Sequence, residues 1–293
     1  ESIAGDGNNL WSYSIFFMSI TAILALLVMK LFGSATKNGV AHAAVAACLG
    51  LSVPLIMISE GWDDHSRADR RTGVDFAKNY LDSLEPNAII FTNGDNDTFP
   101  LWYVQEVEEY RTDVRVVNLS LLNTDWYADQ MKRAAYDSEP VPFSIPEYKY
   151  RQGTRDIVLL KPSRPDAPPV NLSYAMDVAL DDERVEDYGD GKKYSYLPGN
   201  HFSIPIDSAQ VVNAGVVSEK EAGQIVDAIE WTLTEGNGRP KSYLLKNSLL
   251  VLDLLNNNDW SRPIYFAVTT GPDAYIGLNQ YFRLEGLAYR FVP

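Results

Sequence analysis

The sequence has few of the residues that build disulfides and metal centres. Its 293 residues include one cysteine, Cys48, and three histidines, His42, His65 and His201. A single cysteine excludes an internal disulfide framework and any zinc site built on several thiolates. The small number of histidines argues against a histidine-rich metal site. The chain also lacks a glycine-rich phosphate loop, a G-x-S-x-G nucleophile elbow, an H-E-x-x-H zinc motif and internal repeats.

Basic residues are outnumbered as well. The chain has 25 Lys and Arg against 39 Asp and Glu, which gives a net charge of −14. Proteins that hold nucleic acids by neutralising phosphates are basic, so nucleic acid is not an expected partner. A hydrophobic content of 46% with 12% aromatic residues is enough to build a core, which excludes a disordered chain.

The charge is distributed unevenly along the chain. Residues 1–59 balance Glu1 and Asp6 against Lys30 and Lys37, so the negative charge lies in the remainder. Residues 10–32 and 40–59 are mostly uncharged runs of the length that spans a bilayer, about 20 residues, and a short turn joins them. Residues 1–60 are therefore predicted to form a transmembrane helical hairpin. The alternatives are buried helices of a soluble protein or a signal peptide, and the acidic start and the second run disfavour the latter.

Residues 61–293 are predicted to form an α/β domain. Short apolar runs at 88–92, 114–120 and 263–268 are typical of buried strands, and helical patterns lie between them. Strands that alternate with helices imply parallel pairing and helices on both faces of the sheet. The expected fold is Rossmann-like with a mostly parallel sheet. The predicted helices cover residues 69–84, 98–111, 126–135, 218–235, 244–255 and 275–291.

Residues 137–212 interrupt this alternation. The segment is rich in proline and carries an acidic stretch at 181–190. It is predicted to be an irregular insertion with short strands at 157–160 and 202–206. The acidic domain gives only weak support for an extracytoplasmic side, and the basic residues that flank the two apolar runs do not decide the orientation.

Polar side chains follow each predicted central strand. In an open parallel sheet, ligands bind beyond the carboxyl ends of the strands, where these loops meet. We therefore expect a ligand site there, at Asn93, Asp95, Asp97, Asp125 and Thr270.

Two kinds of ligand suit that site. The oxygens of Asp95 and Asp97 suit a divalent cation, Ca²⁺ or Mg²⁺, and the same groups also suit sugar hydroxyls. The alternative is that these residues only cap helices and form turns. His65 is a conceivable general base, although a structural role is favoured. The side chains of Trp102, Trp126 and Trp260 are expected in the core.

Four strings in the chain resemble a known family. They are NAIIFTNGDNDTFPLWY at 87–103, RTDVRVVNLSLLNTDWY at 111–127, RPIYF at 262–266 and DDHSR at 63–67. They are similar to the bacterial protein O-mannosyltransferase-like family of polytopic inner-membrane proteins of unknown function. The resemblance implies that the chain is the last membrane hairpin and the extracytoplasmic domain of a longer protein.

The resemblance also implies a setting for the domain. The membrane and the remaining transmembrane helices of a parent protein are its expected partners, with a possible protein or glycan acceptor. The expected location is the bacterial inner membrane, with the soluble domain in the periplasm. A lipid-linked sugar donor and a catalytic residue outside this chain are implied for the parent, so no residue here is assigned a catalytic role.

Three functions stay open at this point. The first is the acceptor- or glycan-recognition domain of a membrane glycosyltransferase. The second is a membrane-anchored module that binds a metal or a sugar without catalysis. The third is a hydrolase that uses Asp95 and Asp97 as a carboxylate pair, which requires the two groups to lie roughly 5–10 Å apart.

Overall fold

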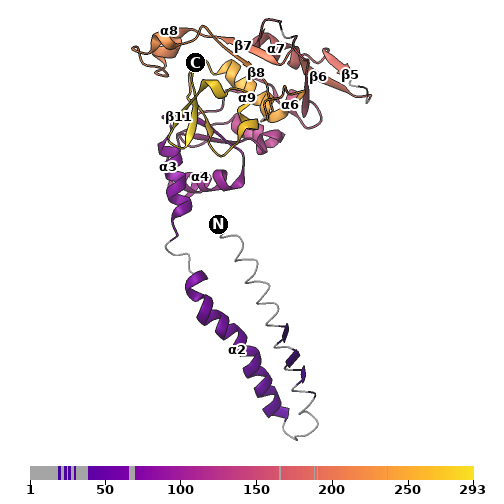
Figure 1. The fold of residues 1–293 in the computed structure, drawn as a ribbon, viewed down its shortest axis with the longest axis vertical. Helices are drawn as coiled ribbons and strands as arrows, with labels where there is room; N and C mark the ends of the chain where they lie inside the picture. Colours follow the sequence, from indigo (N-terminus) through magenta and orange to yellow (C-terminus); the bar gives the residue numbers. More distant parts are fainter. Residues whose placement is uncertain are drawn as a thin grey trace. The chain divides into compact units, whose positions relative to one another are not determined.

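The computed structural model describes two compact units (Figure 1). One comprises residues 1–70 and the other residues 71–293. The residues whose structure is described are 19–20, 23–24, 26–27, 30, 39–65, 70–164, 166–187, 189, 191–235 and 237–293. Most of the first predicted membrane span, 10–32, lies outside them.

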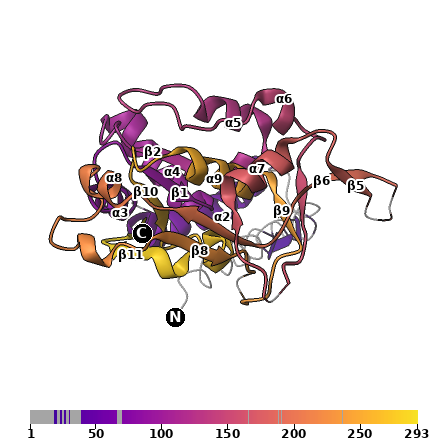
Figure 2. The same cartoon turned by 90° about the horizontal axis from the view of Figure 1, so that it is seen from above.

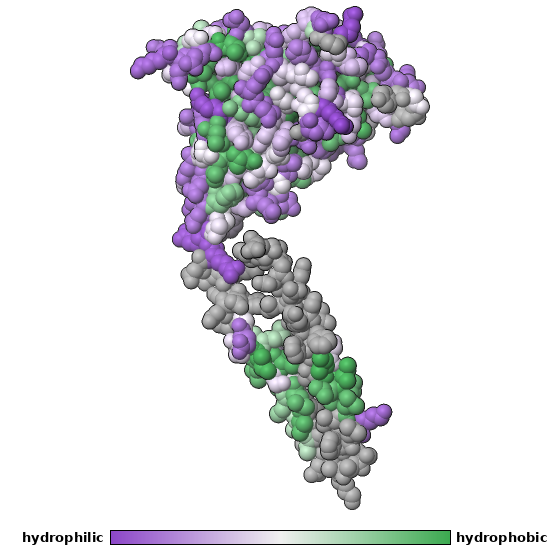
Figure 3. All heavy atoms as spheres, viewed as in Figure 1, coloured by the Kyte–Doolittle hydropathy of each residue, from purple (hydrophilic) through white to green (hydrophobic). Residues whose placement is uncertain are grey.

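The first unit contains the long helix α2 (Gly39–His65). Figure 3 shows hydrophobic side chains along it, and Leu51, Leu55 and Ile56 are each about 60% exposed. Within the described ranges, however, no helix is both long enough and apolar enough to cross a membrane. The predicted transmembrane hairpin is therefore wrong. The helix also continues past the predicted span, through Glu60 to His65.

The second unit is organised around a five-stranded sheet with the order β11-β12-β10-β1-β2. Its central strand β1 (Ile89–Thr92) pairs in parallel with β2 (Arg115–Asn118) on one side and β10 (Ile264–Ala267) on the other. The parallel pairing of the three predicted strands is thus confirmed. The sheet continues from β10 through two antiparallel strands, β12 (Ala288–Phe291) and β11 (Phe282–Glu285).

Both faces of the central strands are buried, because alternate side chains enter different cores. Ile90 packs with α3 (Thr72–Asp82) and α4 (Asp95–Glu108). Ile89 and Phe91 pack on the opposite face, with α5 (Asp125–Met131) and α9 (Lys246–Asn257). Figure 2 shows these helices around β1 and β10. Four predicted helices are therefore confirmed, with ends that differ by a few residues.

The insertion is more regular than predicted. Together with two strands that follow it in the sequence, β8 and β9, it forms a four-stranded sheet with the order β5-β6-β3-β9 and a three-stranded sheet with the order β4-β7-β8. Val158, Leu197 and Phe202 join the core on the α9 side of the central sheet. The strands are β3 (Ile157–Leu160), β4 (Val170–Asn171), β5 (Val185–Asp187), β6 (Lys193–Leu197), β7 (His201–Pro205), β8 (Ala228–Thr232) and β9 (Tyr243–Leu245). The helices and 3₁₀ turns of the unit not yet named are η1 (Leu121–Asn123), α6 (Glu147–Tyr150), α7 (Leu172–Leu180), α8 (Ser208–Asn213), η2 (Ala222–Gln224), η3 (Pro272–Tyr275) and η4 (Asn279–Tyr281).

The mostly parallel sheet is also a wrong prediction. Of nine described strand pairings, five are antiparallel, so the sheets are mixed. The predicted helix 218–235 is instead η2 followed by β8. Burial in β8 alternates as it does in a strand, with Ile229 and Trp231 buried and Glu230 between them exposed. The predicted helix 275–291 is broken by Ile276 and Gly277, both with positive φ, and continues as a hairpin.

Candidate functional site

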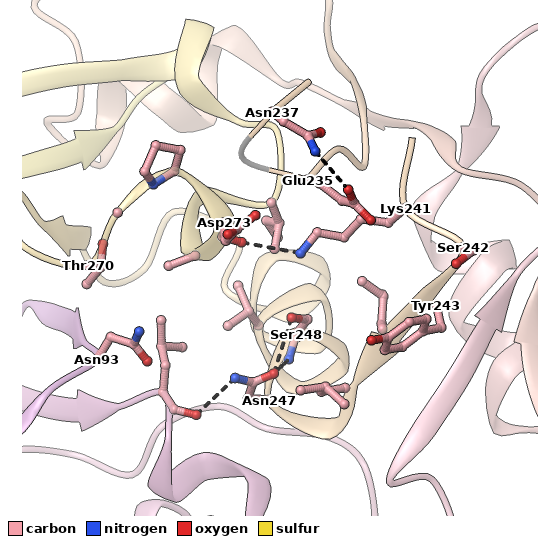
Figure 4. A pocket seen from close by; sticks show the side chains of 18 residues that line it. Asn93, Glu235, Asn237, Lys241, Ser242, Tyr243, Asn247, Ser248, Thr270 and Asp273 are labelled. Atoms are coloured by element: carbon pink, nitrogen blue, oxygen red, sulfur yellow. Dashed lines mark hydrogen bonds between the residues drawn. The ribbon is translucent and has the colours of Figure 1, made fainter. Parts of the chain in front are cut away.

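A cavity of about 730 Å³ opens at the carboxyl ends of the central strands (Figure 4). Asn93 follows β1, Leu119 follows β2, and Thr270 follows β10. This is the position where open α/β sheets bind ligands. We call the cavity the carboxyl-edge pocket.

Short hydrogen bonds fix the sheet side of the pocket. The Ser120 hydroxyl donates to the Asn93 carbonyl at 2.8 Å and to the Asn93 side-chain oxygen at 3.1 Å. The buried Thr270 hydroxyl donates to the Ala267 carbonyl at 2.9 Å, which holds the turn after β10. These hydrogen bonds hold the side chains of Asn93 and Thr270 in the pocket wall without a ligand.

The start of α9 forms the floor. The Asn247 side chain donates to the Leu119 carbonyl at 3.0 Å, and its backbone N–H donates to the Asn123 side-chain oxygen at 3.1 Å. Its own oxygen accepts from the Ser248 N–H at 2.6 Å. The Asn247 amide therefore ties α9 to the end of β2, and its oxygen also accepts from the Ser248 hydroxyl at 3.2 Å (Figure 4).

The remaining wall comes from β9, the loop before it and the turn after β10. Asn237 donates to Glu235 at 3.2 Å, and Lys241 donates to the Asp273 carbonyl at 3.4 Å. Tyr243 is 51% exposed and also lines the pocket (Figure 4). The pocket thus combines amides, hydroxyls, an ammonium, two carboxylates and an aromatic ring. These donors and acceptors suit a ligand with many hydroxyl or amide groups.

Only two of the five predicted site residues, Asn93 and Thr270, line this pocket. Asp97 lies outside the lining and is 5% exposed. One of its carboxylate oxygens accepts from the Gly94 N–H at 3.1 Å, and the other accepts from the Thr269 hydroxyl at 2.7 Å. Asp97 therefore links the loop after β1 to the loop after β10.

The other two predicted residues lie apart from the pocket. Asp95 is exposed in the first turn of α4. Asp125 begins α5, where its carboxylate accepts from the Trp126 N–H at 2.9 Å. This hydrogen bond lowers the pKa of Asp125, with a smaller contribution from the Gln152 N–H. Within the part of the chain that the structure describes, no three His, Cys, Asp or Glu side chains lie close enough together to hold a metal ion.

Several pocket residues were missed by the sequence analysis. Lys241, Tyr243, Asn247 and Ser248 lie just before and within the apolar segment that predicted a helix. The available signal was the polar pair Asn247-Ser248 directly ahead of that apolar run. This pattern is also that of an ordinary helix start, so it does not identify a site by itself.

Comparisons with known proteins support a relationship to an O-mannosyltransferase-like family. The family model described as TMEM260-associated domain 2 matches residues 73–293. The protein O-mannosyl-transferase TMEM260 of Mus musculus is 30% identical over 118 residues, which is 39% of this chain. The match covers 17% of the mouse protein, so the chain spans a small part of that relative. No solved structure matches the chain.

Proposed function

The chain belongs to the TMEM260-associated domain 2 family, and we propose that it is a recognition domain of a protein O-mannosyltransferase-like glycosyltransferase. In this proposal, the carboxyl-edge pocket binds the acceptor polypeptide or its glycan. The sugar transfer is catalysed by another part of the enzyme. The observation that carries the proposal is the 730 Å³ pocket at the carboxyl ends of β1, β2 and β10.

The chemistry of the pocket supports recognition. Asn237, Lys241 and Ser248 carry groups that pair with hydroxyl or amide groups of a ligand, and the Tyr243 ring offers an apolar surface. Asn247 is already held by the end of β2, so the floor is formed before a ligand arrives. A preformed polar pocket loses little conformational entropy on binding, which favours selectivity.

Two observations favour catalysis elsewhere. The mouse relative matches over only 17% of its length. In addition, both carboxylate oxygens of Asp97 accept hydrogen bonds from the protein, which favours a structural role over that of a nucleophile or base in a hydrolase. The alternative of a sugar-binding module without any transferase partner uses the same pocket, and only a transfer assay separates it from the proposal.

The test uses the full-length parent protein with a lipid-linked mannose donor and a polypeptide acceptor. Tyr243→Ala removes the ring from the pocket, and we expect the KM for the acceptor to rise roughly fivefold, the equivalent of about 1 kcal/mol, with little change in kcat. Tyr148→Ala is the control, because Tyr148 is 59% exposed and lies outside the pocket lining. An unchanged acceptor KM in Tyr243→Ala and in a second variant, Lys241→Met, would refute the proposal.

The location of the domain is part of the same proposal. We place it on the periplasmic side of a bacterial inner membrane, in contact with other segments of its parent protein. The net charge of −14 supports a location away from the anionic lipid headgroups of the cytoplasmic leaflet. Protease added to intact spheroplasts should degrade this domain, and complete protection until lysis would place it on the other side.

A further inference from the structure

A second cavity, of about 300 Å³, lies near the amino end of β2. It has an aromatic wall formed by Trp102, Trp126, Tyr127 and Tyr136. The expectation that Trp126 belongs to the core is wrong, because its side chain is 54% exposed, and Tyr136 is 64% exposed. The ring of Tyr127 is 5.5 Å from that of Trp126 and 6.5 Å from that of Trp102. We call this cavity the aromatic pocket.

Arg115 lines the aromatic pocket and is only 5% exposed. One nitrogen of its guanidinium, Nη2, donates to the Gln130 and Arg133 carbonyls at 2.8 Å each. The Nε–H is buried without a hydrogen-bond partner. Within the described part of the chain, no carboxylate lies within 4.0 Å of this guanidinium. Burial lowers the pKa of Arg115 from its usual value, but the group stays cationic near neutral pH.

The other buried arginines have carboxylate partners or more hydrogen-bond acceptors. Arg155 pairs with Asp182, and Arg290 lies 3.6 Å from both Glu85 and Glu285. Arg262 has no carboxylate partner among the described residues, but its three nitrogens donate to four backbone carbonyls and one hydroxyl. A buried charge is normally paired, and a buried donor without a partner costs about 1–3 kcal/mol. Arg290 also has a buried Nε–H without a partner and lines a cavity, but two carboxylates lie near its charge. Among the buried arginines that the structure describes, Arg115 is the one that lines a cavity with neither a carboxylate partner nor acceptors for all of its nitrogens.

We propose that the aromatic pocket binds a carboxylate carried on an apolar or hydrophobic-faced body, with the carboxylate against Arg115 and the body against the rings of Trp126 and Tyr136. An acidic side chain of a polypeptide and a uronic acid both have this chemistry. The inference is independent of the carboxyl-edge pocket, because Arg115 starts β2 whereas that pocket lies beyond the other end of the strand.

Glu106 restricts the charge of the ligands that the aromatic pocket can bind. Its carboxylate lines the same pocket and accepts a hydrogen bond from the Tyr136 hydroxyl. A negative charge beside the binding position disfavours a dianion such as a phosphate monoester more strongly than a monoanion. The pocket therefore suits a single carboxylate, and neutralising Glu106 should strengthen binding.

The experiment titrates the complete 293-residue chain with two matched pairs of probes. The peptide pair is N-acetyl-Leu-Asp-amide and N-acetyl-Leu-Asn-amide, and the sugar pair is methyl glucuronide and methyl glucoside. Binding is followed through the tryptophan indole signals in NMR spectra. We expect saturable shifts of the Trp126 indole and a Kd at least about tenfold lower for the acid than for its neutral partner in one pair or both. The pair that discriminates identifies the source of the carboxylate.

Three variants and one control decide the assignment. Arg115→Met should abolish the preference for the acid, Trp126→Ala should weaken the binding of both probes in a pair, and Glu106→Gln should lower the Kd of the acid. Tyr174→Ala is the control, because Tyr174 is also 54% exposed and lies outside the pocket lining. Equal binding of acid and neutral probes by the native chain would overturn the proposal. If Arg115→Met does not fold, an unchanged acid Kd in both Trp126→Ala and Glu106→Gln would overturn it as well.

Discussion

At the scale of single residues, buried polar groups connect loops that are distant in the sequence. Asp97 accepts hydrogen bonds from the loops after β1 and β10, and Thr98 beside it shares a hydrogen bond of 2.7 Å with Thr92. The Asn118 side chain also donates to the Thr98 hydroxyl at 2.9 Å. This network lies under the carboxyl edge and holds the ends of the three parallel strands together.

The first prediction separates a structural role of Asp97 from a ligand-binding role. Asp97→Ala should lower the free energy of unfolding by about 1–3 kcal/mol, because it leaves the Gly94 N–H and the Thr269 hydroxyl without their acceptor. Asp95→Ala is the matched control and should change it by no more than about 0.5 kcal/mol, because Asp95 is exposed. Urea denaturation measures both. Unchanged stability in Asp97→Ala, with lost activity of the parent protein, would instead indicate a ligand role.

At the scale of elements, positive-φ positions decide where the last segment turns. Ile276 has a φ of 46° and Gly277 a φ of 85°, so a helix cannot continue through them. Gly277 also approaches another element closely, since an added Cβ would lie 2.1 Å from the Thr232 carbonyl oxygen at the end of β8. The segment therefore packs against β8 and returns as the β11–β12 hairpin.

The second prediction tests this close approach. Gly277→Ala should destabilise the protein by about 3 kcal/mol or more, because a methyl group adds a backbone clash to the cost of positive φ. Gly215→Ala is the control, since Gly215 has a φ of 70° but open space around the added atom. It should cost about 1–2 kcal/mol. Thermal melting followed by circular dichroism measures both, and equal losses would show that the contact with Thr232 is unimportant.

At the scale of the whole domain, one sheet separates two cores. Leu101 belongs to the core under α3 and α4, and Leu252 belongs to the core that α9 shares with the insertion. Both side chains are fully buried. Alternate side chains of β1 enter the two cores, so the same sheet bounds both. Disruption of one core therefore also destabilises the sheet against which the other core packs.

The third prediction follows from this shared sheet. Leu101→Ala and Leu252→Ala should each lower the free energy of unfolding by about 2–5 kcal/mol, the usual cost of a leucine-sized cavity. Residues 71–293 should still unfold in one transition in both variants. Urea curves followed by circular dichroism and by tryptophan fluorescence should therefore coincide. Two separate transitions would show that the insertion and the α3–α4 side fold independently.

The sequence by itself determined the three central strands, their parallel pairing and four helices around them. Apolar four-residue runs such as 89–92 and the helical patterns between them are local signals. Helical crossover connections between such strands make the strands parallel neighbours in one sheet. The same reasoning predicted the carboxyl edge and two of its pocket residues, Asn93 and Thr270. It failed for residues 218–235, where capping residues suggested a helix and the partner strand β7 imposes a strand.

Only the tertiary structure decided the rest of the site. β9 exists because it pairs with β3, more than 80 residues earlier, and this pairing brings Tyr243 to the pocket wall. Asp97 follows a strand like Asn93, yet the Thr269 hydroxyl and the Gly94 N–H hold its carboxylate away from the pocket. Contacts between distant segments set these orientations. The pattern of residue types along the chain identifies candidate site residues. Which of these side chains reach the pocket depends on the residues that folding places beside them.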